Sequence, residues 1–105
     1  MPDFSKILEQ AQQMQGRLEK IQDELQGMTV TATSGGGMVT VEADGKGQIT
    51  KVRVDPSIVN ASDVEMLEDL LLVALRDAQQ KSTDLAKQEM GKLTGGMSLP
   101  FKLPF

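Results

Sequence analysis

Apolar residues near the amino terminus recur at alternating steps of three and four, which is the spacing of one face of an α-helix. The pattern predicts a helix over about Asp3–Gln26, with Leu8 widening the apolar stripe. A seam sustained over more than three heptads indicates that this helix packs against another element. The seam consists of Phe4, Ile7, Ala11, Met14, Leu18, Ile21, Leu25 and Met28.

After Gly27 the pattern changes to strict alternation of apolar and polar residues, which is typical of strands with one polar face. The glycine-rich stretches Gly35–Gly37 and Asp44–Gly47 interrupt the alternation and predict turns. We therefore expect a three-stranded antiparallel meander with strands at about Met28–Ser34, Met38–Asp44 and Gln48–Val54.

Alternation also assigns side chains to the two faces of this sheet. Threonines of the first strand, together with Glu42 and Asp44 of the second, are expected on the polar face. In the third strand Lys51 and Arg53 are expected on that same face, so that Glu42 lies opposite one of them.

A second helix is predicted over about Asp63–Met90. The Asp55-Pro56-Ser57 segment ends the third strand, because proline cannot donate a ladder hydrogen bond. Ser62 and Glu65 have the spacing of a capping box, with Ser62 as N-cap. The seam of this helix weakens towards its end and consists of Val64, Leu67, Leu71, Ala74, Ala78 and Leu85.

These elements predict one α+β domain over residues 1–93, in the order αβββα, followed by an irregular tail over residues 94–105. Helices of about 36 and 42 Å are too long for a sheet of about 20 Å to cover. A homodimer with projecting helices would bury the remaining seam, and an intramolecular helical hairpin over the sheet is the alternative. The predicted dimer or core seam comprises Ile7, Ala11, Met14, Leu18, Ile21, Leu25, Leu67, Leu71 and Ala74.

Composition excludes several kinds of site. The chain has no histidine and no cysteine, so His-dependent triads, thiolate metal sites and disulfides are impossible. Gly35–Gly37 lacks the lysine and hydroxyl residue of a phosphate loop, and Gly45-Lys46-Gly47 lacks the later glycine of a dinucleotide-binding loop. We therefore expect a non-enzyme without cofactor, metal ion or small-molecule ligand. No apolar run approaches the roughly 20 residues of a membrane span, and the N-terminus lacks the layout of a signal peptide.

The net charge of −4 is unevenly distributed. Residues 55–75 contain five acidic and no basic residues, whereas residues 76–105 contain five basic and three acidic ones. Screening limits exposed charges to a range of about 8 Å at physiological salt, so local basic patches matter more than the total.

Several segments in fixed order resemble the YbaB/EbfC family of bacterial nucleoid-associated proteins. They are the stretch Ser34–Asp77, the upstream Ala11-Gln12-Gln13-Met14-Gln15, and the downstream Gly-Met-Ser-Leu-Pro-Phe-Lys-Leu-Pro-Phe of residues 96–105. The resemblance covers almost the whole chain. It implies a small dimeric protein, cytoplasmic and located in the nucleoid, that binds double-stranded DNA with low sequence specificity. The implied role is nucleoid organisation and gene regulation.

The resemblance also makes the two helices the expected DNA contacts. Basic side chains at helical spacing would neutralise phosphates, and a glutamine beside them would donate to phosphates or base edges. These candidates are Lys6, Gln13, Arg17, Lys20, Arg76, Lys81 and Lys87. The alternative is a protein-interaction module whose heptad helices recruit a partner protein, with incidental DNA binding.

The tail allows two interpretations from the sequence. It contains glycines and prolines, which favour an irregular end. The resemblance implies instead that it docks on the body, with Leu99, Phe101 and Phe105 as anchors.

Overall fold

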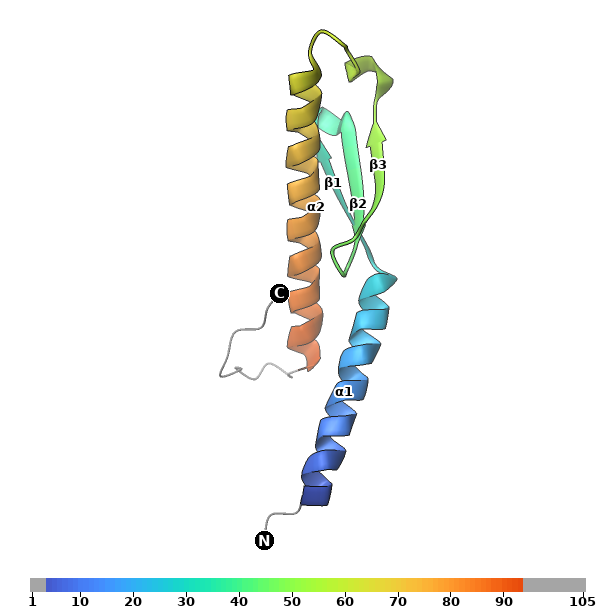
Figure 1. Cartoon of the computed structure of the whole chain (residues 1–105), viewed down its shortest axis with the longest axis vertical. Coiled ribbons are helices and arrows are strands. Elements are labelled where there is room, and N and C mark those ends of the chain that lie inside the picture. Colours follow the sequence, from blue (N-terminus) through green and yellow to red (C-terminus); the bar gives the residue numbers. More distant parts are fainter. Residues whose placement is uncertain (1–3, 94–105) are drawn as a thin grey trace.

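A computed structural model describes residues 4–93 of the 105-residue chain. The fold contains one antiparallel sheet, in the strand order β1-β2-β3 (Figure 1). In the sequence, one long helix precedes the three strands and a second one follows them. The predicted α+β class and αβββα order are confirmed. The elements are α1 (Phe4–Gln26), β1 (Thr29–Ser34), β2 (Val39–Asp44), β3 (Ile49–Val54) and α2 (Val64–Leu93).

The turn between β1 and β2 explains the run of three glycines. Gly35, Gly36 and Gly37 have φ values of 60°, 67° and 95°, a region in which a Cβ atom is strained. Three consecutive residues of this kind let the chain reverse within one short 3-10 turn.

The register of β2 and β3 confirms the expected polar face of the sheet. Glu42 lies opposite Lys51, and Thr40 lies opposite Arg53. Val41 and Val52, which alternate with these residues, lie opposite each other on the other face. The polar face is called the outer face below, because α2 covers the other one.

Asp44 departs from the predicted pattern, since its side chain is 5% exposed instead of lying on the polar face. Its Oδ1 accepts the backbone N–H groups of Lys46 and Gln48 at 2.9 and 3.0 Å. A shift of register between Glu42 and Ala43 lies just before it, and such bulges re-aim the side chains that follow. Asp44 is therefore a structural residue of the β2–β3 turn.

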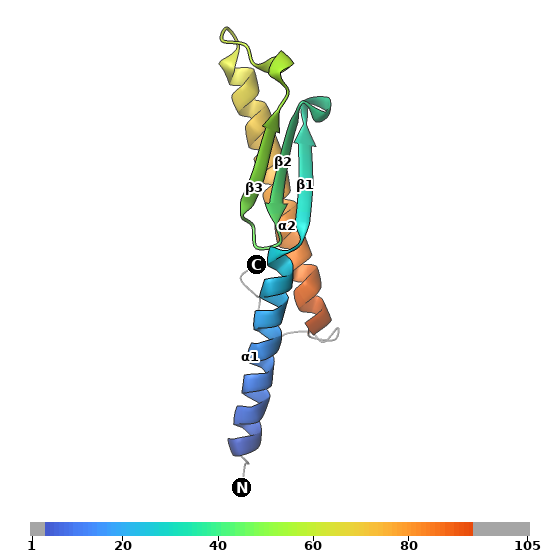
Figure 2. The same cartoon turned by 90° about the vertical axis from the view of Figure 1, so that its right-hand side faces the viewer.

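Helix α2 runs along the inner face of the sheet (Figure 2). Ala74 and Ala78 are fully buried and pack with Val39 and Val41, because a small side chain lets the helix backbone approach the strands closely. The contacts of α2 are mainly with β1 and β2 and much less with β3. The hydroxyl of Ser34 in β1 donates to the carbonyl of Leu70 at 2.6 Å, which adds a polar link between the two elements.

Helix α1 extends away from the sheet and contributes to the elongated shape of 74 × 24 × 18 Å. Leu25, near its end, is the buried residue of this helix. The Gly45 N–H donates to the Leu25 carbonyl at 2.8 Å. A Cβ atom on Gly45 would lie 2.6 Å from the Leu25 carbonyl oxygen, so this attachment requires glycine.

The capping box predicted at the start of α2 is wrong. The Ser62 hydroxyl and N–H both donate to Asn60 Oδ1, at 2.8 and 3.0 Å, which removes Ser62 from the helix start. The cap is Asp63, whose Oδ1 accepts the Met66 N–H at 3.3 Å. A local side-chain turn at Asn60 therefore moves the helix start by one residue.

The predicted tail lies outside the described residues, and so do its expected anchors, Leu99, Phe101 and Phe105.

Candidate nucleic-acid interface

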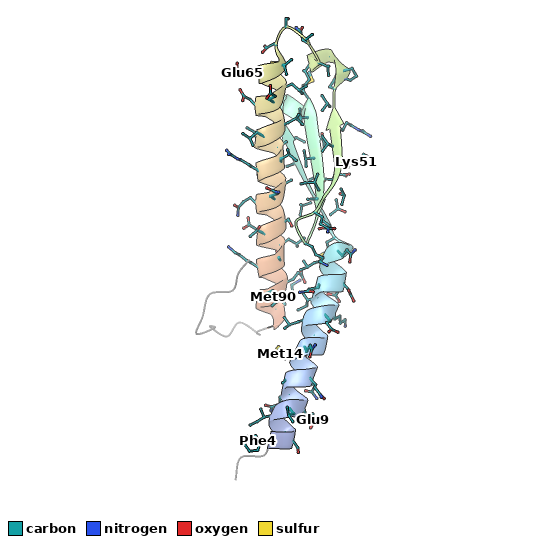
Figure 3. All side chains as sticks on the ribbon, in the orientation of Figure 1. Phe4, Glu9, Met14, Lys51, Glu65 and Met90 are labelled. Carbon is teal, nitrogen blue, oxygen red and sulfur yellow. The ribbon has the colours of Figure 1, made fainter. Side chains whose placement is uncertain are left out.

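The candidate residues of α1 lie on its surface. Lys6, Gln13, Arg17 and Lys20 are all exposed. Because α1 projects from the sheet, α2 and the strands leave much of its surface accessible (Figure 1). The helix is not uniformly basic, since Glu9 (Figure 3) is exposed on it. Glu19 is exposed on it as well.

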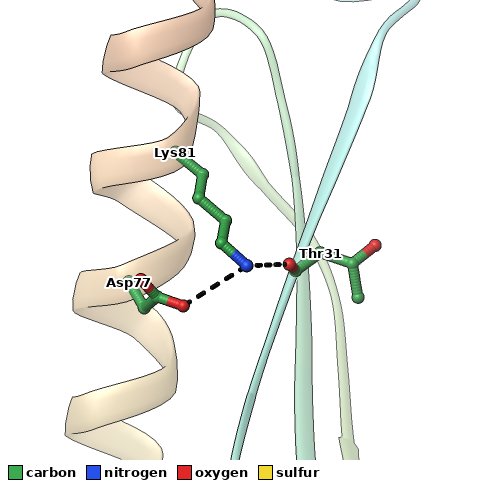
Figure 4. A network of polar contacts seen from close by, with 3 residues as sticks. All are labelled: Thr31, Asp77 and Lys81. Carbon is green, nitrogen blue, oxygen red and sulfur yellow. Dashed lines mark hydrogen bonds and ion pairs between the residues drawn. The ribbon is translucent and has the colours of Figure 1, made fainter.

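The candidate residues of α2 differ in how their charges are used. Arg76 and Lys87 are exposed and have no ion-pair partner within residues 4–93. Lys81 instead donates from Nζ to the backbone carbonyl of Thr31 at 2.8 Å and lies 3.5 Å from the Asp77 carboxylate (Figure 4). Its ammonium group therefore links α2 to β1, and Arg76 and Lys87 keep their charges available.

The Lys81 contact also covers part of an exposed sheet edge. β1 and β3 are the two edge strands of the sheet. An edge strand presents unpaired backbone groups, and lysine is one of the residues that cover such edges in natural proteins. The described residues place no comparable side chain on β3.

The predicted seam is divided between buried and exposed positions. Leu25 and Ala74 are buried, whereas Leu18, Ile21, Leu67 and Leu71 are partly buried. Ile7, Ala11 and Met14, in the projecting part of α1, are exposed, as is Phe4 at 69%. The described chain thus covers the seam where α1 meets the body and leaves it open further out.

A second apolar region is exposed beside β3. Val52 faces the same side as the buried Val41 but is 47% exposed, since α2 lies over β1 and β2. Leu72 of α2 is 46% exposed. It precedes Lys81 by nine residues, or about two and a half helical turns, so the two side chains lie on opposite sides of α2 and Leu72 points away from β1.

A cavity lies among the described residues. The cavity has a volume of about 360 Å³ and lies where α1 and α2 meet the β2–β3 turn. Lys46 is the one ionisable residue that lines it. Within residues 4–93 no acidic cluster is arranged to hold a metal ion. None of the described helices has the length and apolar character needed to cross a bilayer.

Asp55 has a shifted pKa. The backbone N–H of Ser57 donates to its Oδ1 at 2.9 Å, and the Ser57 hydroxyl contributes as well. Both interactions favour the charged form and hold the pKa of the Asp55 carboxyl below its usual 3.8. The residue closes the turn after β3, so this shift reflects the fold.

Two cations that the helix-based prediction omitted lie on the outer face of the sheet. Lys51 and Arg53 are exposed, and neither has an ion-pair partner within the described part of the chain. The alternation of β3 in the sequence already placed them on the polar face. Only the structure shows that no acidic side chain within residues 4–93 forms an ion pair with them.

Comparison with known proteins identifies the family. The model of the YbaB/EbfC DNA-binding family matches residues 1–97. This chain belongs to that family. A nucleoid-associated protein of Gemmatimonas aurantiaca is 48% identical over 103 residues, which cover 98% of this chain and 99% of that protein. A nucleoid-associated protein of Desulfotalea psychrophila is 44% identical over 98 residues, which cover 93% of this chain and 92% of that protein.

A solved structure supports the fold of this YbaB/EbfC chain. The crystal structure of an uncharacterized protein of Helicobacter pylori, HP0035, superimposes with a TM-score of 0.81 at 25% sequence identity. The match covers 90% of this chain and 100% of that one. The YbaB/EbfC family is a DNA-binding family and not a class of enzymes.

Proposed function

We propose that this chain is a nucleoid-associated protein that binds double-stranded DNA as a homodimer, with little preference for sequence. The observation that carries the proposal is the set of exposed cations on α1 and α2 in a chain of a DNA-binding family. Its relatives are named nucleoid-associated proteins, which supports a location in the nucleoid, and hence in the cytoplasm.

Phosphate neutralisation is the proposed source of affinity. Each lysine or arginine at a phosphate releases counterions, which makes binding sensitive to salt. Arg17, Lys20, Arg76 and Lys87 are exposed and unpaired among the described residues, and Lys6 is exposed on the same helix as the first two. The major groove is about 12 Å wide and admits one α-helix.

Low sequence preference follows from the same side chains. Phosphate contacts fix the position of a protein on DNA but carry no sequence information. Gln13 is the candidate for contact with base edges, since a glutamine amide can form two hydrogen bonds with the major-groove edge of adenine. One such residue per protomer among several phosphate contacts favours broad coverage of the chromosome. Broad coverage would influence nucleoid organisation and access to promoters.

The exposed apolar region beside β3 is the proposed homodimer surface. Val52 and Leu72 are both about half exposed and lie with the partly buried Val54, Leu71 and Leu75 between the uncovered side of β3 and α2. A closed two-fold dimer would set this surface against its own copy. The β1 side is less suited, because Lys81 occupies its edge.

The DNA assignment is tested by charge reversal on α1. Arg17→Glu together with Lys20→Glu should weaken binding to a mixed-sequence duplex in a salt-titrated gel shift. The mass of the free protein should remain that of the dimer. Glu19→Gln on the same helix is the opposite control, since removing a repulsive charge should tighten binding. Unchanged affinity in the double variant would refute the assignment of these two cations.

The exposed seam of α1 favours one other function, that of a protein-interaction module. Phe4, Ile7 and Met14 form an uncovered apolar stripe suited to a partner helix. A stoichiometric partner protein in a pull-down, combined with no DNA binding at about 0.15 M salt, would support this function instead.

A further inference from the structure

The sheet is the one element group with an excess of basic residues. α1 carries three basic and four acidic residues, and α2 carries four basic and six acidic ones. Residues 29–54 carry three basic residues, Lys46, Lys51 and Arg53, against Glu42 and Asp44. Because Asp44 is buried in the β2–β3 turn, Glu42 is the remaining acid on that surface.

The outer face of the sheet brings these cations together. Lys51 points away from α2 (Figure 3), and Arg53, two residues along β3, lies on the same side. Both side chains are exposed, and neither has an ion-pair partner in residues 4–93. Lys51 lies opposite Glu42 in the register, yet no ion pair within 4.0 Å joins them.

Threonine hydroxyl groups lie on the same face of the sheet as the two cations. Thr40 lies opposite Arg53, and Thr31 lies opposite Glu42 on the other side of β2. Thr29 and Thr33 share the outer face of β1 with Thr31, and all three are exposed. Threonine hydroxyls are regular donors to phosphate oxygens, along with lysine and arginine. The face therefore combines hydroxyl donors on β1 and β2 with two cations on β3.

We propose that this outer face is a second phosphate-contacting surface for duplex DNA, with Lys51 and Arg53 as its principal contacts. The inference rests on the proposed DNA-binding function and adds a surface to it. Charge complementarity favours a polyanion over an apolar partner, because the face has no large apolar side chain among its outward residues. It lies on the opposite side of β3 from Val52, so the proposed dimer surface leaves it accessible.

Salt dependence distinguishes a phosphate contact from a general charge effect. The double variant Lys51→Gln and Arg53→Gln should bind a mixed-sequence duplex more weakly. Its log–log salt slope should fall by about 0.9 for each contact that is lost. The control Val59→Glu and Ala61→Glu changes the net charge by the same amount at exposed positions outside the sheet, and its slope should match the unaltered protein. An unchanged slope in the sheet variant would overturn the inference.

A gain of affinity provides a test in the opposite direction. Glu42→Gln removes the acid beside Lys51 and should tighten DNA binding. Glu65→Gln, in the first turn of α2 and away from the outer face, should have little effect on DNA binding (Figure 3). Equal behaviour of the two variants would contradict the proposed contact.

The absence of cysteine allows a direct test of proximity. Thr33→Cys, labelled with a thiol-reactive photocrosslinker, should form crosslinks to duplex DNA while Lys51 and Arg53 remain in place. Ala61→Cys, labelled in the same way, should not. Thermal melting of each variant establishes that it is folded. Crosslinks at Ala61 alone would overturn the inference, as would capture of an acidic protein at Thr33 in place of DNA.

These outcomes separate the inference from the function on which it rests. If charge reversal at Arg17 and Lys20 abolishes DNA binding and the sheet variants leave it unchanged, the second surface is wrong and the function stands. If the unaltered protein fails to bind duplex DNA in dilute salt, the proposed function itself is wrong.

Discussion

The two long helices have similar sequence patterns but different surroundings. α2 lies along the sheet, and its seam includes the fully buried Ala74 and Ala78. α1 has a more regular heptad seam, yet it is buried only at Leu25, within its last turn. Six-residue strands span about 20 Å, so one sheet can cover one long helix and not two. Regular spacing therefore predicts that a helix forms, while the length of its support decides how much of it packs.

This difference assigns the helices different roles. Substitutions in the seam of α2 should act mainly on stability. Substitutions in the projecting part of α1 should act mainly on binding or association, because those side chains have few contacts in the described chain. Leu25 is the exception on α1, since it fastens the helix to the body.

The largest expected effect distinguishes the attached and projecting parts of α1. Leu25→Ala should lower the free energy of unfolding by about 2–5 kcal/mol, because it removes a buried side chain from the only buried position of this helix. Leu8→Ala, at a 63% exposed position, should change it by less than about 0.5 kcal/mol. Urea unfolding at fixed protein concentration measures both. A large effect at Leu8 would mean that a second copy covers the projecting seam.

A matched pair of alanines compares the two seams directly. Ala78→Leu should destabilise the protein by about 1–3 kcal/mol, because α2 lies too close to the strands for a larger side chain. Ala11→Leu adds the same atoms to an exposed position on α1 and should be nearly neutral. Thermal melting of the two variants tests the comparison. Similar melting temperatures would show that the α2 seam is more adaptable than its burial indicates.

The sequence predicted the fold well because its signals are local. Apolar periodicity, the triple glycine and the proline after β3 each act within a few residues, and together they predicted all five helices and strands in the right order. The start of α2 was misassigned because Ser62 and Asp63 are adjacent and the side chain of either can cap a helix. Asn60 decides the competition by accepting both donors of Ser62.

The candidate site was less predictable because its features depend on distant residues. Lys81 meets Thr31 across 50 positions of sequence, and Gly45 meets Leu25 across a strand pair. The periodicity of α2 makes Lys81, Arg76 and Lys87 equivalent surface cations. Only the packing of α2 over β1 distinguishes the first from the other two. The exposure of Lys51 and Arg53 likewise depends on which face of the sheet α2 covers.

Lys81 provides a prediction of intermediate size. Lys81→Met keeps the aliphatic length but removes the hydrogen bond to Thr31, which should cost about 0.5–1.5 kcal/mol of stability. The effect on DNA binding should be smaller than that of Lys87→Met, which removes an unpaired charge from the same helix. Thermal melting and salt-titrated gel shifts measure the two effects. Greater loss of DNA binding at Lys81 than at Lys87 would assign the Lys81 ammonium to DNA despite its contact with β1.

The smallest expected effect concerns the segment through which the chain enters α2. Hydrogen bonds from Ser57 lower the pKa of Asp55 in the folded state, so the folded protein favours the carboxylate more than the unfolded chain does. The resulting stabilisation is present above the unfolded pKa of 3.8 and is lost as the pH falls through the lower folded pKa.

Asp55→Asn should remove this pH dependence and keep the turn, because an asparagine oxygen also accepts an N–H two residues further on. The variant should melt at a slightly lower temperature than the unaltered protein near pH 6, and the difference should disappear in strong acid. Asp69→Asn removes the same charge from the same acidic segment but no hydrogen bond recorded in residues 4–93, so it should not reproduce this profile. If both variants gave the same profile, the acid sensitivity would come from the total charge of residues 55–75.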